Sequence, residues 1–134
     1  MAIFVRLGGE FGRGKVIARD PEGRYLAVHL TIHHRPTLIV AFHADCGTDQ
    51  AESYARAQAA ITIPPGTLDV HLLADTNNRP SALDYCRMNA FNPLDSQDMP
   101  TSPPHHLAAL HSLTQHLGGL RDAFRSLHPD SREY

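Results

Sequence analysis

The residues best suited to chemistry are an acid and an amide, Asp75 and Asn77, at the end of the short apolar run from Leu68 to Ala74. Proline and glycine precede this run and Asn78-Arg79-Pro80 follows it, so the pattern predicts a buried strand bounded by turns. Side chains at the end of a strand can be exposed while the strand fixes their position. A carboxylate there can accept a proton or bind a metal, and an amide can donate hydrogen bonds to an anion. The alternative is an Asp and an Asn in an ordinary turn.

Ten histidines raise the question of a metal site. His106, His111 and His116 are spaced by five residues, whereas two ligands on one helix face need a spacing of three or four. The pairs His33-His34, in a turn, and His105-His106, at a helix start, are both expected to be exposed to solvent. Two cysteines are too few for a disulfide framework or a four-thiolate zinc site. We therefore expect no structural zinc site.

Length and composition indicate one folded domain. The chain has 134 residues, of which 42% are hydrophobic, and its formal net charge is −2. This charge gives no basic footprint for nucleic acid, although an enzyme can hold phosphates through a metal and a few local cations. No apolar run is long enough for a membrane and no secretory leader is visible. We expect an intracellular protein, nuclear or cytoplasmic, with no membrane partner.

The first half of the chain alternates as strands do. We predict strands over Lys15–Arg19, Tyr25–Ile32 and Thr37–Phe42, separated by turns at Asp20–Gly23 and His33–Pro36. Such short connections favour an antiparallel meander. The last of these strands is continuously apolar, so we expect it to be buried on both faces.

Helical spacing follows in two places. A helix over Asp49–Ala60 is predicted from a capping pair, Asp49 and Glu52, and an apolar stripe. The stripe consists of Ala51, Tyr54, Ala55 and Ala59. Leucines repeat at helical spacing from Leu107 to Leu120, with a break at Gly118-Gly119. Further elements are a strand over Met1–Leu7 and a short helix near Ser81–Met88. The fold class is α+β, with helices packed on a mixed, largely antiparallel sheet.

Three stretches of the sequence point to a family. The segment Leu120–Pro129, which runs on to Tyr134, follows the pattern Leu-x-Asp-x-aromatic-Arg-x-x-His-Pro. Upstream, Ala74-Asp75-Thr76-Asn77 is similar to a Gly-Asp-Phe-Asn motif with two substitutions, and the meander from Gly23 to Phe42 lies at the expected distance. In this order the stretches resemble the endonuclease/exonuclease/phosphatase superfamily, the DNase I-like fold. They are closest to the endonuclease domains of non-LTR retrotransposons.

This resemblance implies that residues 1–134 form part of a DNase I-like α/β sandwich, incomplete at both ends. The implied activity is Mg²⁺-dependent phosphodiester hydrolysis with DNA as substrate. Asp75 would orient or deprotonate the attacking water and touch the metal, and Asn77 would hold the phosphate. His43 stands where the family has an assisting Tyr. The family's principal metal ligands, an Asn and a Glu before this region and an Asp-His pair after it, are missing here.

Because those ligands are missing, we expect a fragment that is inactive alone. One alternative is a non-catalytic remnant or interaction module, and another is a phosphatase of the same fold. An incomplete sandwich has uncovered strand edges, so we also expect self-association through these edges.

Overall fold

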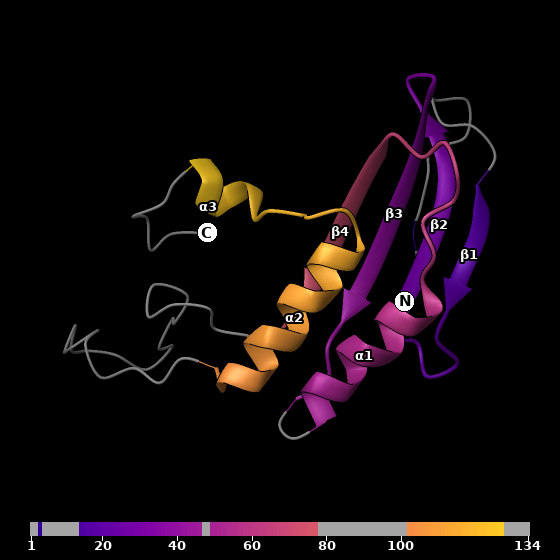
Figure 1. Cartoon of the computed structure of the whole chain (residues 1–134). Helices are drawn as coiled ribbons and strands as arrows, with labels where there is room; N and C mark the ends of the chain where they lie inside the picture. Colours follow the sequence, from indigo (N-terminus) through magenta and orange to yellow (C-terminus); the bar gives the residue numbers. More distant parts are fainter. Residues whose placement is uncertain (1–2, 4–13, 47–48, 78–101, 128–134) are drawn as a thin grey trace, which may run out of the picture.

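The computed structural model describes residue 3 and residues 14–46, 49–77 and 102–127 (Figure 1). In chain order its elements are β1 (Lys15–Arg19), β2 (Tyr25–Ile32), β3 (Arg35–His43), α1 (Gln50–Ala60), β4 (Asp69–Asp75), α2 (Pro104–His116) and α3 (Ala123–Leu127). The expected α+β class is confirmed. The strand predicted over Met1–Leu7 and the helix predicted near Ser81–Met88 lie outside the described residues. Among the described helices, none combines the length and the hydropathy that a membrane span requires.

The sheet has four strands in the order β1-β2-β3-β4. The pairs β1–β2 and β2–β3 are antiparallel, which confirms the predicted meander, and β4 runs parallel to β3 (Figure 1). The parallel pair is possible because α1 returns the chain to the starting end of β3 before β4 begins. The sheet is therefore mixed, as expected, and β3 and β4 both finish at the same end of the sheet.

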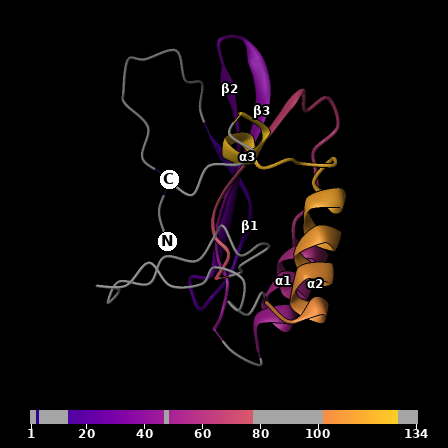
Figure 2. The same ribbon diagram turned by 90° about the vertical axis from the view of Figure 1, so that its left-hand side faces the viewer.

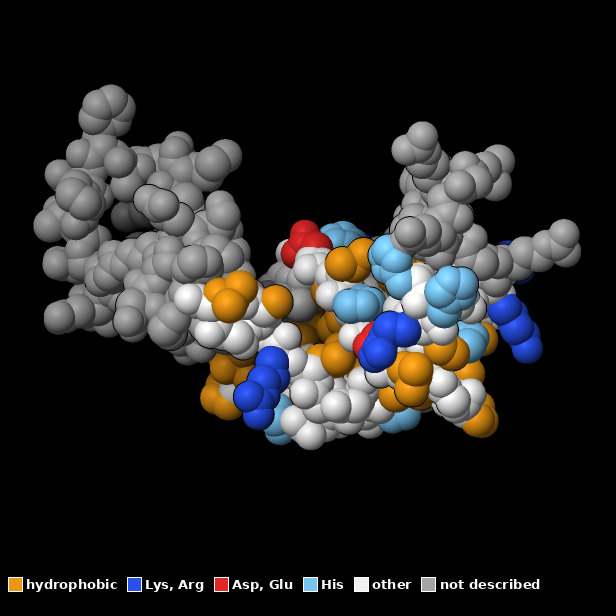
Figure 3. Space-filling view, turned by 90° about the horizontal axis from the view of Figure 1, so that it is seen from above, with side chains coloured by type: hydrophobic (Ala, Val, Ile, Leu, Met, Phe, Trp, Pro, Cys, Tyr) orange, Lys and Arg blue, Asp and Glu red, His pale blue; other side chains and the backbone are white. Residues whose placement is uncertain are grey.

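A two-residue hairpin joins β2 to β3. His33 and His34 both have positive φ, 47° and 64°, as a type I′ turn requires. Both are exposed, as predicted. Figure 3 views this end of the molecule from above and shows histidine side chains gathered beside basic and hydrophobic ones. This end lies opposite to the edge where β3 and β4 finish (Figure 1).

The helices α1 and α2 cover one face of the sheet (Figure 2). Leu38, Val40 and Phe42 alternate along β3 toward these helices and are fully buried. The Phe42 ring packs against Tyr54 of α1, with ring centroids 5.3 Å apart. Leu113 of α2 belongs to the same core. Thr37 and Ala41 are also buried on the opposite face, whereas Ile39 between them is half-buried, so the prediction that β3 is buried on both sides is confirmed in part.

The prediction of a buried strand over Leu68–Ala74 is wrong. In the described sheet β4 lies at an edge, and Leu68 and Leu73 are each 62% exposed. Val70 and Leu72 point to the other face and pack partly against the core. When helices cover only one face of an edge strand, every second side chain of that strand faces solvent. The sequence run is apolar at both kinds of position, so it did not reveal this alternation.

The helix α1 corrects two details of the prediction. Asp49 occupies the N-cap position, but its side chain makes no capping hydrogen bond. The buried residues of α1 are Gln50, Ser53, Tyr54 and Ala57. Of the predicted apolar stripe, only Tyr54 is buried. Polar side chains at Gln50 and Ser53 are tolerated there because both hydrogen-bond to backbone carbonyls, of Thr76 and Gln50 respectively.

The prediction that both His105 and His106 are exposed is also wrong in part. His105 is exposed, as expected, but His106 is buried in the first turn of α2. Its Nε2 has no hydrogen-bond partner within the described part of the chain. Burial, and to a smaller extent the neighbouring His105, lowers the pKa of His106 below its ordinary 6.5.

This burial makes the stability of the protein sensitive to acid. As the pH falls below 6.5, His106 of the unfolded chain takes up a proton before His106 of the folded chain does. The free energy of unfolding should therefore decrease between about pH 7.5 and pH 5.5. Urea unfolding of His106→Leu should show a smaller decrease over this range, and exposed His111→Gln should match the parent. Equal decreases in the parent and in His106→Leu would contradict this.

Candidate functional site

The parallel pairing of β3 and β4 brings two of the predicted site residues together. His43 and Asp75 are direct partners in the register of the two strands. The His43 Nε2 lies 3.9 Å from the Asp75 Oδ2, and the side chains are 43% and 66% exposed. Phe42 and Ala44 point into the core, so His43 and Asp75 project from the face opposite to the helices. The pair is thus open to solvent at the end of the two strands.

Asn77 joins this pair through two hydrogen bonds. Its backbone N–H donates to Asp75 Oδ1 over 3.1 Å, and its side-chain Nδ2 donates to the carbonyl of Ala44 over 2.7 Å. Its backbone is left-handed, with φ of 49°, a conformation that Asn tolerates better than most residues. One N–H of the amide is used by Ala44, and the other can serve a ligand. Asn77 therefore ties the end of β4 to the end of β3.

The helix α1 supports the segment that carries these residues. Gln50 Nε2 donates to the Thr76 carbonyl over 2.8 Å, and the Tyr54 hydroxyl donates to the same oxygen. The Ala44 N–H donates to the Asp75 carbonyl over 2.9 Å, which extends the pairing of the two strands by one bond. Two side chains of the crossover helix thereby fix the backbone between Asp75 and Asn77.

A charged network beside His43 was not predicted from the sequence. Arg24 Nη1 lies 3.1 Å from His43 Nδ1, and Arg24 Nη2 lies 2.7 Å from Asp45 Oδ1. The second oxygen of Asp45 pairs with Arg56 of α1 at 2.9 Å. The Asp45 side chain is only 15% exposed, and each of its two oxygens pairs with an arginine.

The sequence does contain signals for this network. Asp45 follows His43 by two residues, just as Asn77 follows Asp75, so both strands end in the same polar pattern. Arg24 directly follows the turn Asp20–Gly23, whose Asp20 side chain accepts the Arg24 N–H at 2.9 Å. The turn and the strand ends were recognised separately, but nothing in the local sequence indicates that Arg24 reaches His43.

The described residues do not make a complete Mg²⁺ site. Among them, no group of three or more His, Cys, Asp or Glu side chains could hold a metal ion. Asp75 offers an exposed carboxylate, whereas Asp45 is occupied by two arginines. Mg²⁺ prefers six oxygen ligands and keeps its waters reluctantly, so a single carboxylate binds it weakly.

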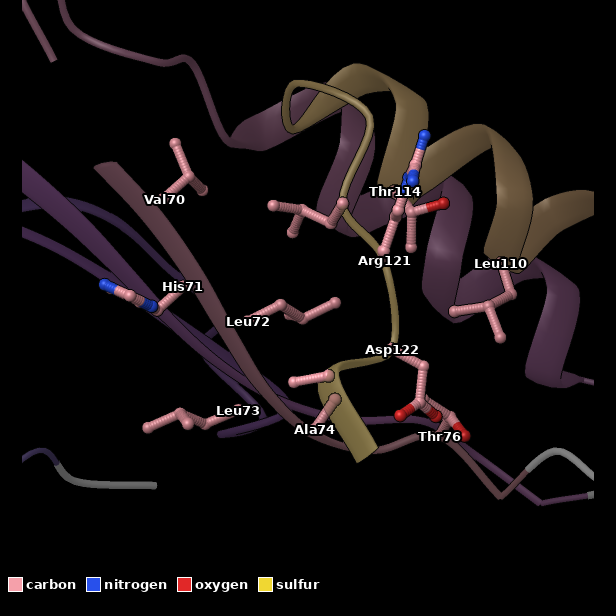
Figure 4. A pocket seen from close by; sticks show the side chains of 12 residues that line it. Val70, His71, Leu72, Leu73, Ala74, Thr76, Leu110, Thr114, Arg121 and Asp122 are labelled. Atoms are coloured by element: carbon pink, nitrogen blue, oxygen red, sulfur yellow. The ribbon is translucent and has the colours of Figure 1, made fainter. Parts of the chain in front are cut away.

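A pocket of about 480 Å³ lies between β4 and the end of α2 (Figure 4). Leu72 points into it from β4, and Leu110 and Thr114 of α2 line the opposite side (Figure 4). Arg121 and Asp122 contribute its charged groups. His43, Asp75 and Asn77 do not line this pocket. The three predicted site residues lie outside it, at the solvent-exposed ends of β3 and β4.

No protein-family model matches the sequence, and no match is found among curated proteins. The resemblance to the endonuclease/exonuclease/phosphatase superfamily therefore depends on the sequence motifs described above alone.

The hydrogen bonds of Asn77 yield a prediction for stability. Asn77→Gly removes the bond to Ala44 but suits the left-handed backbone, and we expect a loss of about 0.5–1.5 kcal/mol. Asn77→Ala removes the same bond and adds a methyl group at positive φ, so it should cost about 1 kcal/mol more. Urea unfolding of both variants measures the difference. If Asn77→Ala is as stable as Asn77→Gly, the left-handed conformation is not imposed by the fold.

Proposed function

We propose that this chain carries part of the catalytic site of a Mg²⁺-dependent phosphodiesterase of the DNase I-like fold, with DNA as its substrate. One observation supports this most strongly. His43, Asp75 and Asn77 come from two separate stretches of sequence and meet at one exposed edge of the sheet. A carboxylate, an amide and an imidazole at such an edge are the groups that phosphodiester hydrolysis needs.

The arrangement of the sheet is compatible with an incomplete sandwich. The helices cover one face (Figure 2), while Leu26, Val28 and Ile39 are apolar and half-buried on the other. An apolar second face suits a fold in which a further layer packs on it. We propose on this basis that residues 1–134 belong to a partial endonuclease/exonuclease/phosphatase domain.

The roles of the side chains follow from their chemistry. Asp75 accepts a proton from the attacking water as the water oxygen bonds to phosphorus and one P–O ester bond breaks. The departing ester oxygen takes a proton from solvent. Asn77 and His43 donate hydrogen bonds to the non-bridging oxygens, whose negative charge increases along this step. Two donors and one acceptor thus surround the phosphate.

Bound Mg²⁺ would offset negative charge on the phosphate, but Asp75 can supply only one of its ligands. The remaining oxygen ligands must come from outside the described residues. The resemblance implies that the family's principal ligands are missing from this sequence, and on that ground we propose that the 134-residue chain is inactive alone and retains weak phosphate binding.

A DNA-binding measurement tests the placement of the phosphate. Without Mg²⁺ the Asp75 carboxylate repels a phosphate bound beside it, so Asp75→Asn should bind a fluorescent DNA duplex about three to five times more tightly at low salt. Glu22→Gln is the control, because Glu22 is an exposed carboxylate in the turn before β2, two strands away from β4. Fluorescence anisotropy with chelator present measures both. Equal affinities for the two variants would contradict the proposal.

A plasmid-nicking assay with Mg²⁺ tests the predicted inactivity. We expect no nicking above background by the parent chain. Nicking that Asp75→Asn abolishes and Glu22→Gln preserves would refute the inactivity and support the phosphodiesterase. Nicking that survives Asp75→Asn would contradict the assignment of this site.

A second candidate function is that of an interaction module, favoured by the exposed edge strand β4. Leu73 projects from this strand and is largely exposed. We propose that copies of the chain associate through this edge. Leu73→Lys should then lower the weight-average sedimentation coefficient, because a charged residue blocks edge-to-edge pairing and shifts the protein toward the monomer. Leu127→Lys, at an exposed site on α3, is the control. A parent chain that sediments as a monomer would contradict this candidate.

A further inference from the structure

We propose that Arg24 is a positioning residue that holds His43 in a single tautomer, with its proton on Nε2. His43 then acts at the site as a hydrogen-bond donor to a phosphoryl oxygen and not as a base. The identity of this ligand rests on the proposed function, whereas the tautomer concerns the free protein.

The contact between the two side chains fixes the direction of the hydrogen bond. Arg24 Nη1 lies 3.1 Å from His43 Nδ1. A guanidinium has only N–H donors, so Nδ1 must be the acceptor and carry no proton. In a neutral imidazole the single proton is then on Nε2. The structure therefore assigns opposite roles to the two ring nitrogens.

Within the described part of the chain, the His43 Nε2 has no acceptor at hydrogen-bond distance, so its N–H can serve a ligand. It faces Asp75 Oδ2 at 3.9 Å, which is longer than a hydrogen bond. The His43 side chain is nearly half exposed at this edge. A phosphoryl oxygen or a water that approaches the pair can accept this hydrogen. The Asp75 carboxylate is a hydrogen-bond acceptor, so one side chain serves as donor and the other as acceptor.

Arg24 is well placed to impose the tautomer because it is held at both ends. Its backbone N–H donates to Asp20, and its carbonyl accepts the His43 N–H at 2.8 Å. Its guanidinium is paired with the largely buried Asp45. Asp45 is itself fixed by Arg56, so the guanidinium cannot leave His43 without breaking the Asp45 pair.

The tautomer can be read directly by NMR. In protein labelled with ¹⁵N, the shifts of the two ring nitrogens distinguish a protonated from an unprotonated nitrogen. We expect His43 of the ligand-free protein at neutral pH to show an unprotonated Nδ1 and a protonated Nε2. A proton on Nδ1 would overturn the inference, whether or not the protein acts on DNA.

Variants separate the effect of Arg24 from a general loss of structure. Arg24→Met should shift the Nδ1 resonance toward the protonated value, because the donor is gone. Arg24→Lys keeps a donor and should restore most of the parent spectrum. Arg35→Met is the matched control, since it breaks a similar pair with Asp69 at the opposite end of the sheet. A spectrum unchanged in Arg24→Met, or changed equally in Arg35→Met, would overturn the inference. The parent spectrum remains decisive if Arg24→Met does not fold.

A thymidine dinucleotide then tests the role of the donor. Added to the parent protein, it should shift the Nε2 resonance of His43, and the shift should be smaller in Arg24→Met. A fixed tautomer whose Nε2 resonance does not respond to the dinucleotide would overturn the donor role and count against the proposed function. The tautomer result would stand apart from that failure.

Discussion

The parallel pairing of β3 with β4 is the constraint on which the arrangement of this protein depends. His43 and Asp75 are far apart in the sequence and become neighbours only because the two strands run in the same direction in a single register. The register is maintained from both sides. The core residues of β3 pack under α1, and Tyr54 and Gln50 of α1 hold the Thr76 carbonyl just beyond β4. A slip by one residue would turn every side chain of β4 to the other face.

Charge balance at the ends of these strands supplies the second constraint. Asp45 is largely buried between Arg24, which directly precedes β2, and Arg56, on α1. Removing this carboxylate would leave two guanidinium groups close together without their shared partner, which costs several kcal/mol when such a pair is buried. The partial exposure of both arginines reduces this cost through solvent screening. The network nevertheless joins the first hairpin, the central strand and the crossover helix at one point, next to His43.

Local patterns were sufficient for much of this fold. Alternation and turn residues predicted the meander. The family resemblance placed His43, Asp75 and Asn77 in one candidate site, but local patterns did not predict that β3 and β4 are parallel neighbours. Patterns failed where burial depends on partners distant in sequence. Gln50 and Ser53 lie inside because backbone carbonyls accept their hydrogen bonds, and Leu73 lies outside because β4 has no neighbour on its far side in the described sheet. Arg24 reaches the site only through tertiary contacts, which its neighbours in the sequence do not encode.

The exposure of Asp75 bears on how a site of this kind could work. In a solvent-exposed position the attraction between unit charges at 4 Å is only about 1 kcal/mol, against several times this value where water is excluded. The same holds for the hydrogen bonds of Asn77 and His43 to a developing negative charge. Bound DNA, or further protein packed on the sheet face opposite to the helices, would have to displace water from the ends of β3 and β4 before these groups could stabilise a transition state. Catalysis at this edge would therefore require a cover as well as a metal, and the division of labour between the donor His43 and the acceptor Asp75 would gain its strength only then.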